Sequence, residues 1–226
     1  MIYKNTCLGR FISRPNRFIA HVEIQGEVVI CHVKNTGRCK ELLVPNALVV
    51  LEKAENPLRK TPYDLIAVYK NEKVINIDSV APNKVFGEWA KVAGYFGEIT
   101  KIKPECTYKN SRFDYYIEAD DKKIFIEVKG VTLEKEGILM FPDAPTLRGV
   151  KHLNELADAA KNGYESYVFF VAQMEECKYF TPNQATDSLF ANTLREVAAK
   201  GVKVCCVNCH VGEDRLSINT FVDVVL

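Results

Sequence analysis

Long apolar runs are missing from this sequence, since no stretch approaches the roughly 18 consecutive apolar residues that a membrane-spanning helix needs. The first residues, MIYKNTCLGRFISRPNRF, are polar and basic and lack the apolar centre of a secretory signal. The chain also contains no internal repeat and no low-complexity segment. We therefore expect a cytoplasmic protein with no membrane partner.

Paired cysteine motifs that would hold a metal are missing too, although the chain has eight cysteines. Most stand singly in strand-like runs, where a reduced cysteine behaves as a small hydrophobe, so a disulfide framework is the weaker interpretation. The stretch Cys206-Val-Asn-Cys209-His210 matches the spelling of a c-type haem attachment site. It lies in an apolar, strand-like run, KVCCVNCHV, in which alternate residues face opposite ways. We therefore expect buried thiols there, with no haem and no structural zinc.

A strong excess of either charge is absent as well, because 30 Lys and Arg stand against 29 Asp and Glu, a net charge of +1. The charge is uneven, however: residues 1–80 hold 12 basic and 8 acidic residues, and residues 81–226 hold 18 and 21. This division suits a polyanion-binding module joined to a metal–carboxylate site, with an ordinary solvated surface as the alternative. The 226 residues allow one large domain or two small ones.

The first 80 residues have the pattern of a small β-barrel. Glycine, proline and asparagine separate short apolar runs that show no helical period. Gln25-Gly26 lies between the first two runs and indicates a hairpin. Five strands are predicted, over Arg17–Ile24, Glu27–Val33, Ala47–Leu51, Leu65–Tyr69 and Val74–Ile77. An OB-like barrel has five strands and often binds oligonucleotides, whereas an SH3-like barrel is the alternative that the pattern leaves open.

From Pro82 onward the pattern is that of an α/β domain. Helical spacing is shared by Val85, Glu88, Trp89, Val92 and Phe96. Two more helices are predicted, over about Thr146–Lys161, closed by Asn162-Gly163, and about Ser188–Lys200, closed by Gly201. Strands are predicted over Ile99–Tyr108, Phe113–Glu118, Ile124–Val128, Ile138–Phe141, Tyr167–Ala172, Val202–Val207 and Leu216–Val224. The order helix, three strands, helix, strand is that of the PD-(D/E)XK nuclease core, so we predict two domains, residues 1–81 and 82–226.

A cluster of carboxylates and a lysine lies in the stretch RFDYYIEADDKKIFIEVKG. Asp114 is on one predicted strand, and Glu127 and Lys129 are two residues apart on the next, so these two share a sheet face. The reverse face of that strand is apolar, and a charge in mid-sheet is costly unless it is paired or metal-bound. We predict that Asp114 and Glu127 bind Mg²⁺ or Mn²⁺ and that Lys129 orients the attacking water, with a surface salt bridge as the alternative.

Further polar residues accompany this cluster. Glu88 falls within the apolar stripe of its helix, so it is expected to point at the sheet as a third metal ligand, with a buried salt bridge as the alternative. Asp143 follows a strand and precedes a helix, where helix capping competes with an accessory role. Arg148 and Lys151 are candidates to hold a phosphate, and His152 is a candidate proton shuttle. We expect these three to share one side of the helix, away from its apolar residues, with a solvated basic face as the alternative.

Basic residues also lie near the predicted strand ends and turns of the first domain, at Arg14, Arg17, Lys34, Arg38 and Lys40. Phosphate contacts at these places would give affinity for DNA without reading its sequence. Tyr3, Phe11 and Phe18 could stack bases, although positions in the barrel core are the alternative.

Several short stretches run through most of the chain in a recognisable order: R-P-N-R-F (14–18), N-T-G (35–37) with Lys40, N-P-x-R-K-T-P-Y (56–63), P-N (82–83), R-F-D (112–114), E-V-K (127–129), G-V-T-L (130–133), F-P-D-A-P-T-x-R-G (141–149) and K-H-L (151–153). On these stretches the chain resembles the sugar fermentation stimulation protein A family. The resemblance implies an OB-like N-terminal domain, a PD-(D/E)XK-type C-terminal domain, DNA binding and an association with the control of sugar use. Its metal-site pattern falls on Asp114, Glu127 and Lys129, and also on Glu88. The family often has Ser-Met-Lys after the N-T-G turn, where this chain has Arg38-Cys39-Lys40.

Together these patterns predict a largely sequence-nonspecific DNA-binding protein with a Mg²⁺- or Mn²⁺-dependent nuclease-type site that would hydrolyse phosphodiesters. One alternative is a non-catalytic DNA-binding regulator of sugar (maltose) metabolism that retains the nuclease fold. Another is an enzyme directed at RNA or nucleotides. The pattern leaves double- and single-stranded DNA open as partners. The resemblance also suggests a homodimer, because enzymes with the PD-(D/E)XK fold that it implies often cut both strands as dimers.

Overall fold

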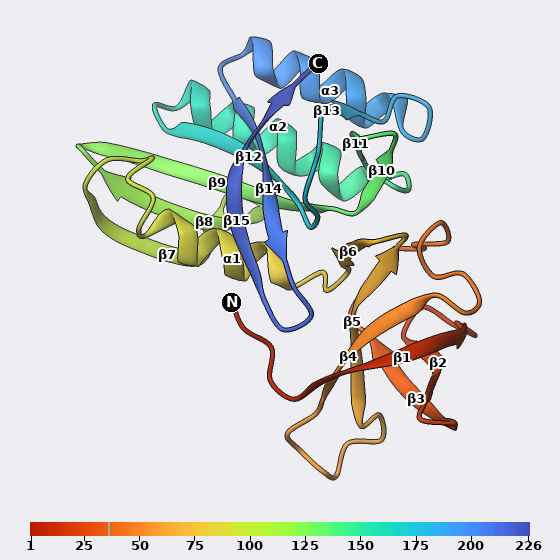
Figure 1. Cartoon of the computed structure of the whole chain (residues 1–226). Coiled ribbons are helices and arrows are strands. Elements are labelled where there is room, and N and C mark those ends of the chain that lie inside the picture. Colours follow the sequence, from red (N-terminus) through yellow and green to blue (C-terminus); the bar gives the residue numbers. More distant parts are fainter. Residues whose placement is uncertain (36) are drawn as a thin grey trace.

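The computed structural model describes residues 1–35 and 37–226, which form two lobes (Figure 1). The first lobe is built from six strands, and the second from nine strands and three helices. Within the described residues, none of the helices has the length and apolar character needed to cross a bilayer. The first lobe ends with β6 (Lys73–Asn76), and the second begins with α1 (Ala81–Ala90).

The first lobe is an OB barrel. Its strands are β1 (Thr6–Ser13), β2 (Ile19–Ile24), β3 (Glu27–Val33), β4 (Leu48–Lys53), β5 (Tyr63–Lys70) and β6. They hydrogen-bond in the order β3-β2-β1-β4-β5-β6, and a parallel pairing of β3 with β5 closes β1–β5 into a ring. The ring order β1-β2-β3-β5-β4, in which the parallel β3–β5 pairing closes the barrel, is that of the OB-like barrel, one of the two that the sequence left open.

The five strands that close the ring differ from the five predicted. The sequence prediction missed β1, because its outward-facing side chains include Arg10 as well as Leu8 and Ile12, so the run does not look like a half-buried strand. It included β6, which pairs with β5 outside the ring. The predicted hairpin between β2 and β3 is confirmed: Gln25 and Gly26 have φ of 51° and 86°, the positive values that a two-residue type I′ turn requires.

The second lobe is an α/β domain with one mixed sheet. The elements after α1 are β7 (Ile99–Tyr108), β8 (Ser111–Ala119), β9 (Lys122–Val131), β10 (Leu133–Lys135), β11 (Ile138–Phe141), α2 (Leu147–Lys161), β12 (Glu165–Ala172), β13 (Tyr179–Pro182), α3 (Ser188–Ala199), β14 (Lys203–Val211) and β15 (Leu216–Val224). The strand order is β10-β11-β13-β15-β14-β12-β9-β8-β7, with β9, β12 and β14 parallel at the centre. The predicted order of helices and strands is confirmed, while the short strands β10 and β13 were missed.

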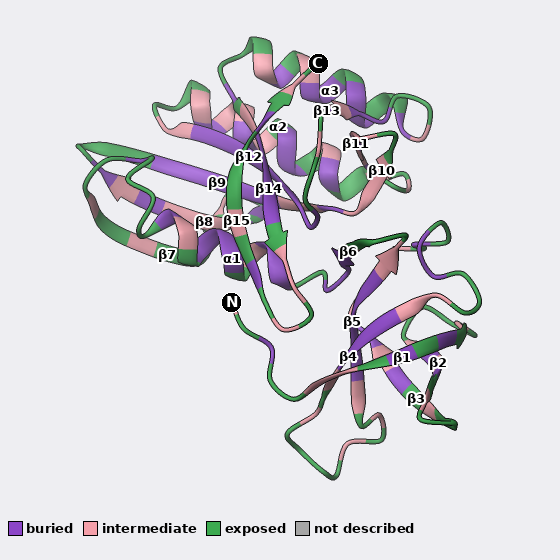
Figure 2. Cartoon of the chain, viewed as in Figure 1, coloured by how far each residue is buried: buried purple, intermediate pink, exposed green. Residues whose placement is uncertain are grey.

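Helices cover both faces of this sheet, so its central strands are buried on both sides (Figure 2). On β9, Ile124, Ile126 and Val128 pack in a cluster with residues of α1. Phe125 faces the other way and packs in a cluster with residues of α2 and α3. Because Glu127 alternates with the first set, it points toward α2. A carboxylate is therefore enclosed between the sheet and a helix.

Helix α1 ends earlier than the spacing of its apolar residues predicts. It stops at Ala90, and Gly94 and Gly97 then adopt φ of 64° and 90°, which no helix contains. Val92, expected on the apolar stripe, is 83% exposed. Phe96 lies beyond the helix yet is buried in the same cluster as Val85 and Phe86 of α1. The glycines turn the chain so that Phe96 returns to the core without a further helical turn.

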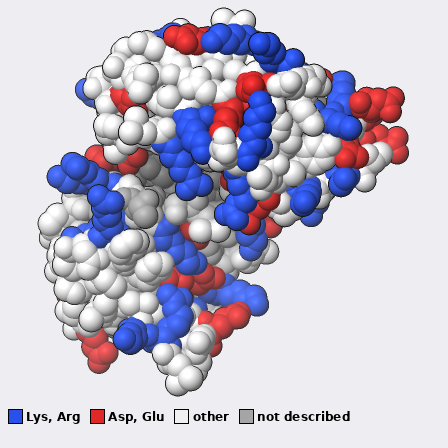
Figure 3. Space-filling model, turned by 180° about the vertical axis from the view of Figure 1, so that it is seen from behind, with Lys and Arg blue, Asp and Glu red and all other residues white. Residues whose placement is uncertain are grey.

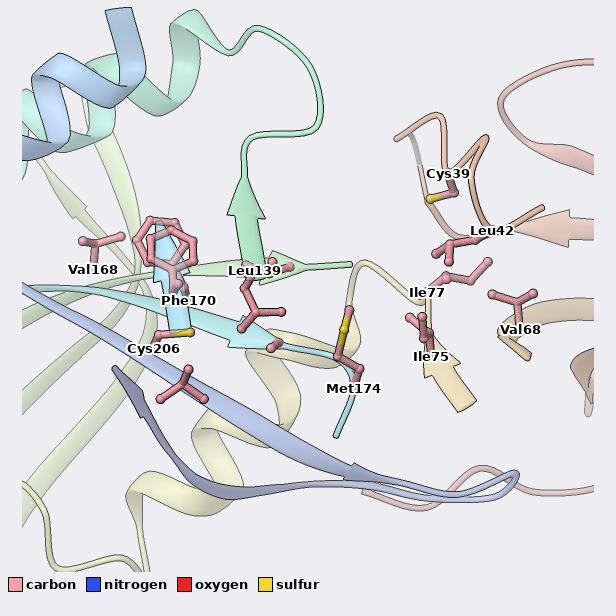
Figure 4. Close-up of a cluster of buried hydrophobic side chains, with 14 of the residues drawn as sticks. Cys39, Leu42, Val68, Ile75, Ile77, Leu139, Val168, Phe170, Met174 and Cys206 are labelled. Atoms are coloured by element: carbon pink, nitrogen blue, oxygen red, sulfur yellow. The ribbon is translucent and has the colours of Figure 1, made fainter. Parts of the chain in front are cut away.

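The two lobes share a hydrophobic core. In Figure 4, Met174 lies between Phe170 and Leu139 of the second lobe and Ile75 and Ile77 of the first, all in one cluster. A buried polar network crosses the same junction through Gln173, whose Nε2 donates to Asn76 Oδ1 at 2.8 Å and to the carbonyl of Asp78 at 2.9 Å. These contacts fix the barrel against the end of the central strands. The predicted boundary between residues 81 and 82 stays a prediction.

Candidate metal centre

Asp114 lies where strands β8 and β9 separate. Their backbone pairing runs as far as Tyr115 opposite Ile126, and Asp114 is the next residue outward. Its Oδ2 accepts the amide proton of Val128 at 2.7 Å, so a side chain replaces the backbone partner at this point. Its Oδ1 accepts from Asn83 Nδ2, also at 2.7 Å. The carboxylate is thereby held at the opening between the two strands.

The pKa of the Asp114 carboxyl is raised above its ordinary value. Burial is the larger cause, and the neighbouring charge of Glu127 is the next, while the Val128 amide and Lys129 act in the opposite direction. Two carboxylates that disfavour each other's charge in a buried place are a natural site for a cation, because a divalent ion removes the repulsion.

Glu127 is 3% exposed, and its two oxygens have different surroundings. Oε1 accepts from His152 Nδ1 at 2.5 Å and from the ammonium of Lys129. Oε2 is buried and has no hydrogen-bond partner among the described residues. Burial raises the pKa of Glu127, but the bond from His152 and the charge of Lys129 outweigh it, so the pKa lies below its ordinary value. The carboxylate is therefore charged and has one oxygen without a partner.

A hard divalent cation fits this donor set. The partnerless Oε2 of Glu127 is a buried anionic oxygen that lacks a ligand, and each oxygen of Asp114 keeps a lone pair beyond its single hydrogen bond. No group of three or more His, Cys, Asp or Glu arranged to hold a metal occurs in residues 1–35 and 37–226. Mg²⁺ needs no such group, because it usually keeps several waters and binds through one or two carboxylates.

The prediction that Glu88 is a third ligand is wrong in its geometry. Its side chain is 51% exposed, and its Oε2 accepts from the amino group of Met1 at 2.7 Å. Helix α1 turns Val85 and Phe86 to the sheet and leaves Glu88 outside that face. The residue of α1 that does reach the site is Asn83, at the start of the helix. Only the Pro-Asn pair at residues 82–83 marked this position in the sequence.

His152 and Arg148 of α2 connect to the carboxylates, which sequence reasoning missed. His152 was expected to share a side of the helix with Arg148 and Lys151, away from the apolar residues, but it is 5% exposed, packs among those residues and bonds Glu127. Arg148 Nε lies 3.5 Å from His152 Nε2 and donates to it, while the Nδ1 edge of the imidazole faces Glu127. Lys151 is exposed and its Nζ donates to the carbonyl of Asn110, in the turn between β7 and β8.

Asp143 does not cap α2, although capping was the competing interpretation. Thr146 is the N-cap residue, since its side chain accepts from the amide of Gly149 at 3.0 Å. Asp143 is exposed and lies against Gly37 of the barrel, where an added Cβ would come within 2.7 Å of its Oδ2. Asp143 therefore borders the junction of the two lobes.

The basic residues of the barrel divide into two groups. Arg14 and Lys34 bind within the protein, which corrects their assignment to phosphate. Arg14 donates to four backbone carbonyls, those of Arg17, Asn35, Gly37 and Arg38. Lys34 forms ion pairs with the buried Asp64 at 3.2 Å and Asp78 at 3.7 Å. By contrast, the side chains of Arg17, Arg38 and Lys40 are exposed and remain candidates to bind an anion.

The structure also shows which of the candidate aromatic residues and cysteines are buried. Tyr3 and Phe11 are buried, as the barrel-core alternative has it, whereas Phe18 is 55% exposed. All eight cysteines are free thiols. Cys206 and Cys209 lie in hydrophobic clusters on opposite faces of the sheet, so they do not converge on one ligand.

Comparison with known proteins agrees with this fold. A family model described as the SfsA N-terminal OB domain matches residues 12–77, and one described as the sugar fermentation stimulation protein RE domain matches residues 80–215. A sugar fermentation stimulation protein homolog of Clostridium beijerinckii is 56% identical over 226 residues, covering 100% of both chains, and one of Desulfitobacterium hafniense is 55% identical, covering 100% of this chain and 99% of the other. The structure of Pyrococcus furiosus SfsA in complex with Ca²⁺ superposes with a TM-score of 0.91 and 26% identity, covering 100% of this chain and 98% of that one. With matches of this extent in sequence and in structure, the chain belongs to the sugar fermentation stimulation protein family.

Proposed function

We propose that this protein is a divalent-cation-dependent phosphodiesterase that acts on nucleic acid. One observation carries the proposal: Glu127 presents a buried, partnerless oxygen beside the carboxylate of Asp114. The similarity to a Pyrococcus furiosus protein solved with Ca²⁺ supports it, since Ca²⁺ and Mg²⁺ both take oxygen ligands. The exposed cations of the OB barrel supply the other half of the proposal, affinity for a polyanion.

Asp114 and Glu127 would hold the cation, Mg²⁺ or Mn²⁺. The ion would supply Lewis-acid activation of water and neutralise charge on the phosphate. Asn83 and the Val128 amide orient Asp114, and His152 keeps Glu127 Oε1 engaged so that Oε2 is left to bind. Lys129 is placed to leave Glu127 Oε1 and hold the attacking water or a phosphate oxygen. The water oxygen would then bond to phosphorus as the opposite P–O ester bond breaks; the water gives up one proton and the leaving oxygen takes one up, so that a phosphomonoester and an alcohol result.

A non-catalytic regulator is the second candidate function. It is favoured by the contact between the Lys129 ammonium and Glu127 Oε1, since a lysine paired in this way is not available to water. Such a protein would bind DNA through the barrel and influence sugar metabolism, including that of maltose, without cutting.

Cleavage assays separate the two candidates. Plasmid, single-stranded and branched DNA would be incubated with the protein and Mg²⁺ or Mn²⁺, beside Asp114→Asn, Lys129→Ala and, as a matched control on α2, Asn154→Ala, whose side chain is exposed. We expect the protein and Asn154→Ala to cut and the other two variants to lose nearly all activity. Binding without cutting would favour the regulator. Cutting that persists in Asp114→Asn and Lys129→Ala would refute the assignment of the site.

A further inference from the structure

A groove on the OB barrel, separate from the carboxylates, brings apolar and basic side chains together. It has a volume of about 590 Å³ and is lined by the loop between β1 and β2 and by the connection from β3 to β4. Its apolar lining includes Ile12, which is 40% exposed, the exposed Pro45, and Phe11 and Leu43, which are buried at 3% and 8%. Its exposed cations are Arg17, Arg38 and Lys40. A ligand that fits must offer both flat apolar surface and negative charge.

The groove continues toward the metal centre. A second hollow of about 370 Å³ shares Arg17, Gly37 and Arg38 with it and reaches Thr146, the N-cap of α2. Two residues further along the helix, Arg148 contacts His152, which bonds Glu127. Figure 3 shows Lys and Arg side chains on both lobes beside the depression that separates them. A chain lying in the groove would thus be directed to the catalytic carboxylates.

We infer that this groove binds one unpaired strand of a polynucleotide, so that the substrate of the metal centre is single-stranded. The inference rests on the function proposed above. In an unpaired strand the faces of the bases are free to pack on apolar side chains, while the phosphates meet the cations. In a duplex the faces are stacked on one another and only base edges and phosphates point outward. An apolar lining would gain nothing from a duplex.

The charges on the rest of the barrel favour the groove over the outer face of β2 and β3, on which many OB folds bind their ligands. On that face the exposed Glu23 lies opposite Arg10 of β1, so these two charges leave no excess of positive charge to attract phosphates. Within the second hollow, Asp143 is exposed and would repel a phosphate. The backbone of a bound strand is therefore expected to follow Arg17 and Arg38, on the barrel side.

Binding measured without cleavage tests the inference. A labelled oligonucleotide of about 20 nucleotides, longer than one OB fold covers, would be compared with its duplex by fluorescence anisotropy in EDTA, over a range of salt concentrations. We expect the strand to bind about tenfold more tightly than the duplex, or better, because packing a base on an apolar side chain such as Ile12 buries apolar surface that a duplex does not offer. Arg38→Ala and Lys40→Ala should each weaken binding and lower the slope of log K against log salt by about 0.7. Ile12→Ser should weaken binding without changing that slope.

The controls separate this inference from the proposed function. Lys53→Ala removes an exposed cation of β4 that does not line the groove, and it should bind the strand as the unmodified protein does. Circular dichroism would establish that each variant is folded. Equal or tighter binding of the duplex, or unchanged binding by Ile12→Ser and Arg38→Ala, would overturn the inference. If the strand is bound as expected but never cut with Mg²⁺ or Mn²⁺, the inference stands and the proposed hydrolysis fails. If the duplex is bound more tightly and is cut, the inference fails and the proposed hydrolysis stands.

Discussion

Replacing His152 with alanine should weaken cation binding at a site that the imidazole never touches. His152 is 5% exposed and supplies one of the two donors to Glu127 Oε1. Without it, Glu127 can rotate and share both oxygens with Lys129, so Oε2 is no longer reserved for a cation. Partners that orient a ligand in this way typically contribute 10–100-fold to metal affinity, which is about 1.4–2.8 kcal/mol.

The same substitution should lower stability, because it leaves a buried carboxylate with one donor fewer. A hydrogen bond to a charged group contributes about 1.5–3 kcal/mol, and the lost imidazole adds a cavity. His152→Gln keeps a donor and should recover part of both losses. Asn154→Ala, on the exposed side of α2, is the matched control.

Calorimetric titration with Ca²⁺ measures the first effect and urea unfolding in EDTA measures the second. Ca²⁺ is suitable because it takes oxygen ligands, and the affinity is obtained without turnover. Should His152→Ala remain folded and bind Ca²⁺ as the unmodified protein does, the orienting role would be refuted. Failure of the unmodified protein itself to bind would instead count against the metal centre.

Three further results are expected. Lys129→Ala should abolish cleavage, while the affinity for Ca²⁺, measured by titration, stays equal or rises because the ammonium group that competes for Glu127 is gone. A large fall in affinity would show instead that Lys129 holds the carboxylate in place. Burial raises the pKa of Asp64, but Arg59, His32 and Lys34 outweigh it and lower the pKa from 3.8 to about 2. The charged carboxylate should therefore stabilise the fold by roughly 2 kcal/mol relative to Asp64→Asn above about pH 4, and this stabilisation should be lost as the pH falls toward 2. A difference in unfolding free energy between the two proteins that stays constant over this pH range would contradict the prediction. Met174→Ala should lower the free energy of unfolding by about 2–5 kcal/mol in urea titrations because Met174 is 3% exposed in the core between the lobes, and a loss below 1 kcal/mol would mean that the lobes repack without it.

Local patterns were sufficient for much of the fold. The alternation on β9 placed Glu127 opposite an apolar face, and the structure has it there, between the sheet and α2. Turn residues such as Gln25-Gly26 and Asn162-Gly163 were also predicted, because their backbone conformations depend on neighbouring residues alone. By contrast, the strand β1 was missed because its exposed face mixes apolar and basic residues, and one of its two partners, β4, lies far along the chain.

The sequence by itself determined the α/β order of the second lobe, the shared face of Glu127 and Lys129, and the place of Asp114 on the neighbouring strand. Only the tertiary structure decided which other residues join them. In the structure Asn83 rather than Glu88 reaches the site and bonds Asp114, and His152 faces inward and bonds Glu127. Arg14 donates to backbone carbonyls instead of remaining free for a phosphate. These outcomes depend on where α1 ends, how α2 is rotated on the sheet and how the barrel loop folds back. Such positions are set by packing between segments far apart in the chain, which a local periodicity does not record.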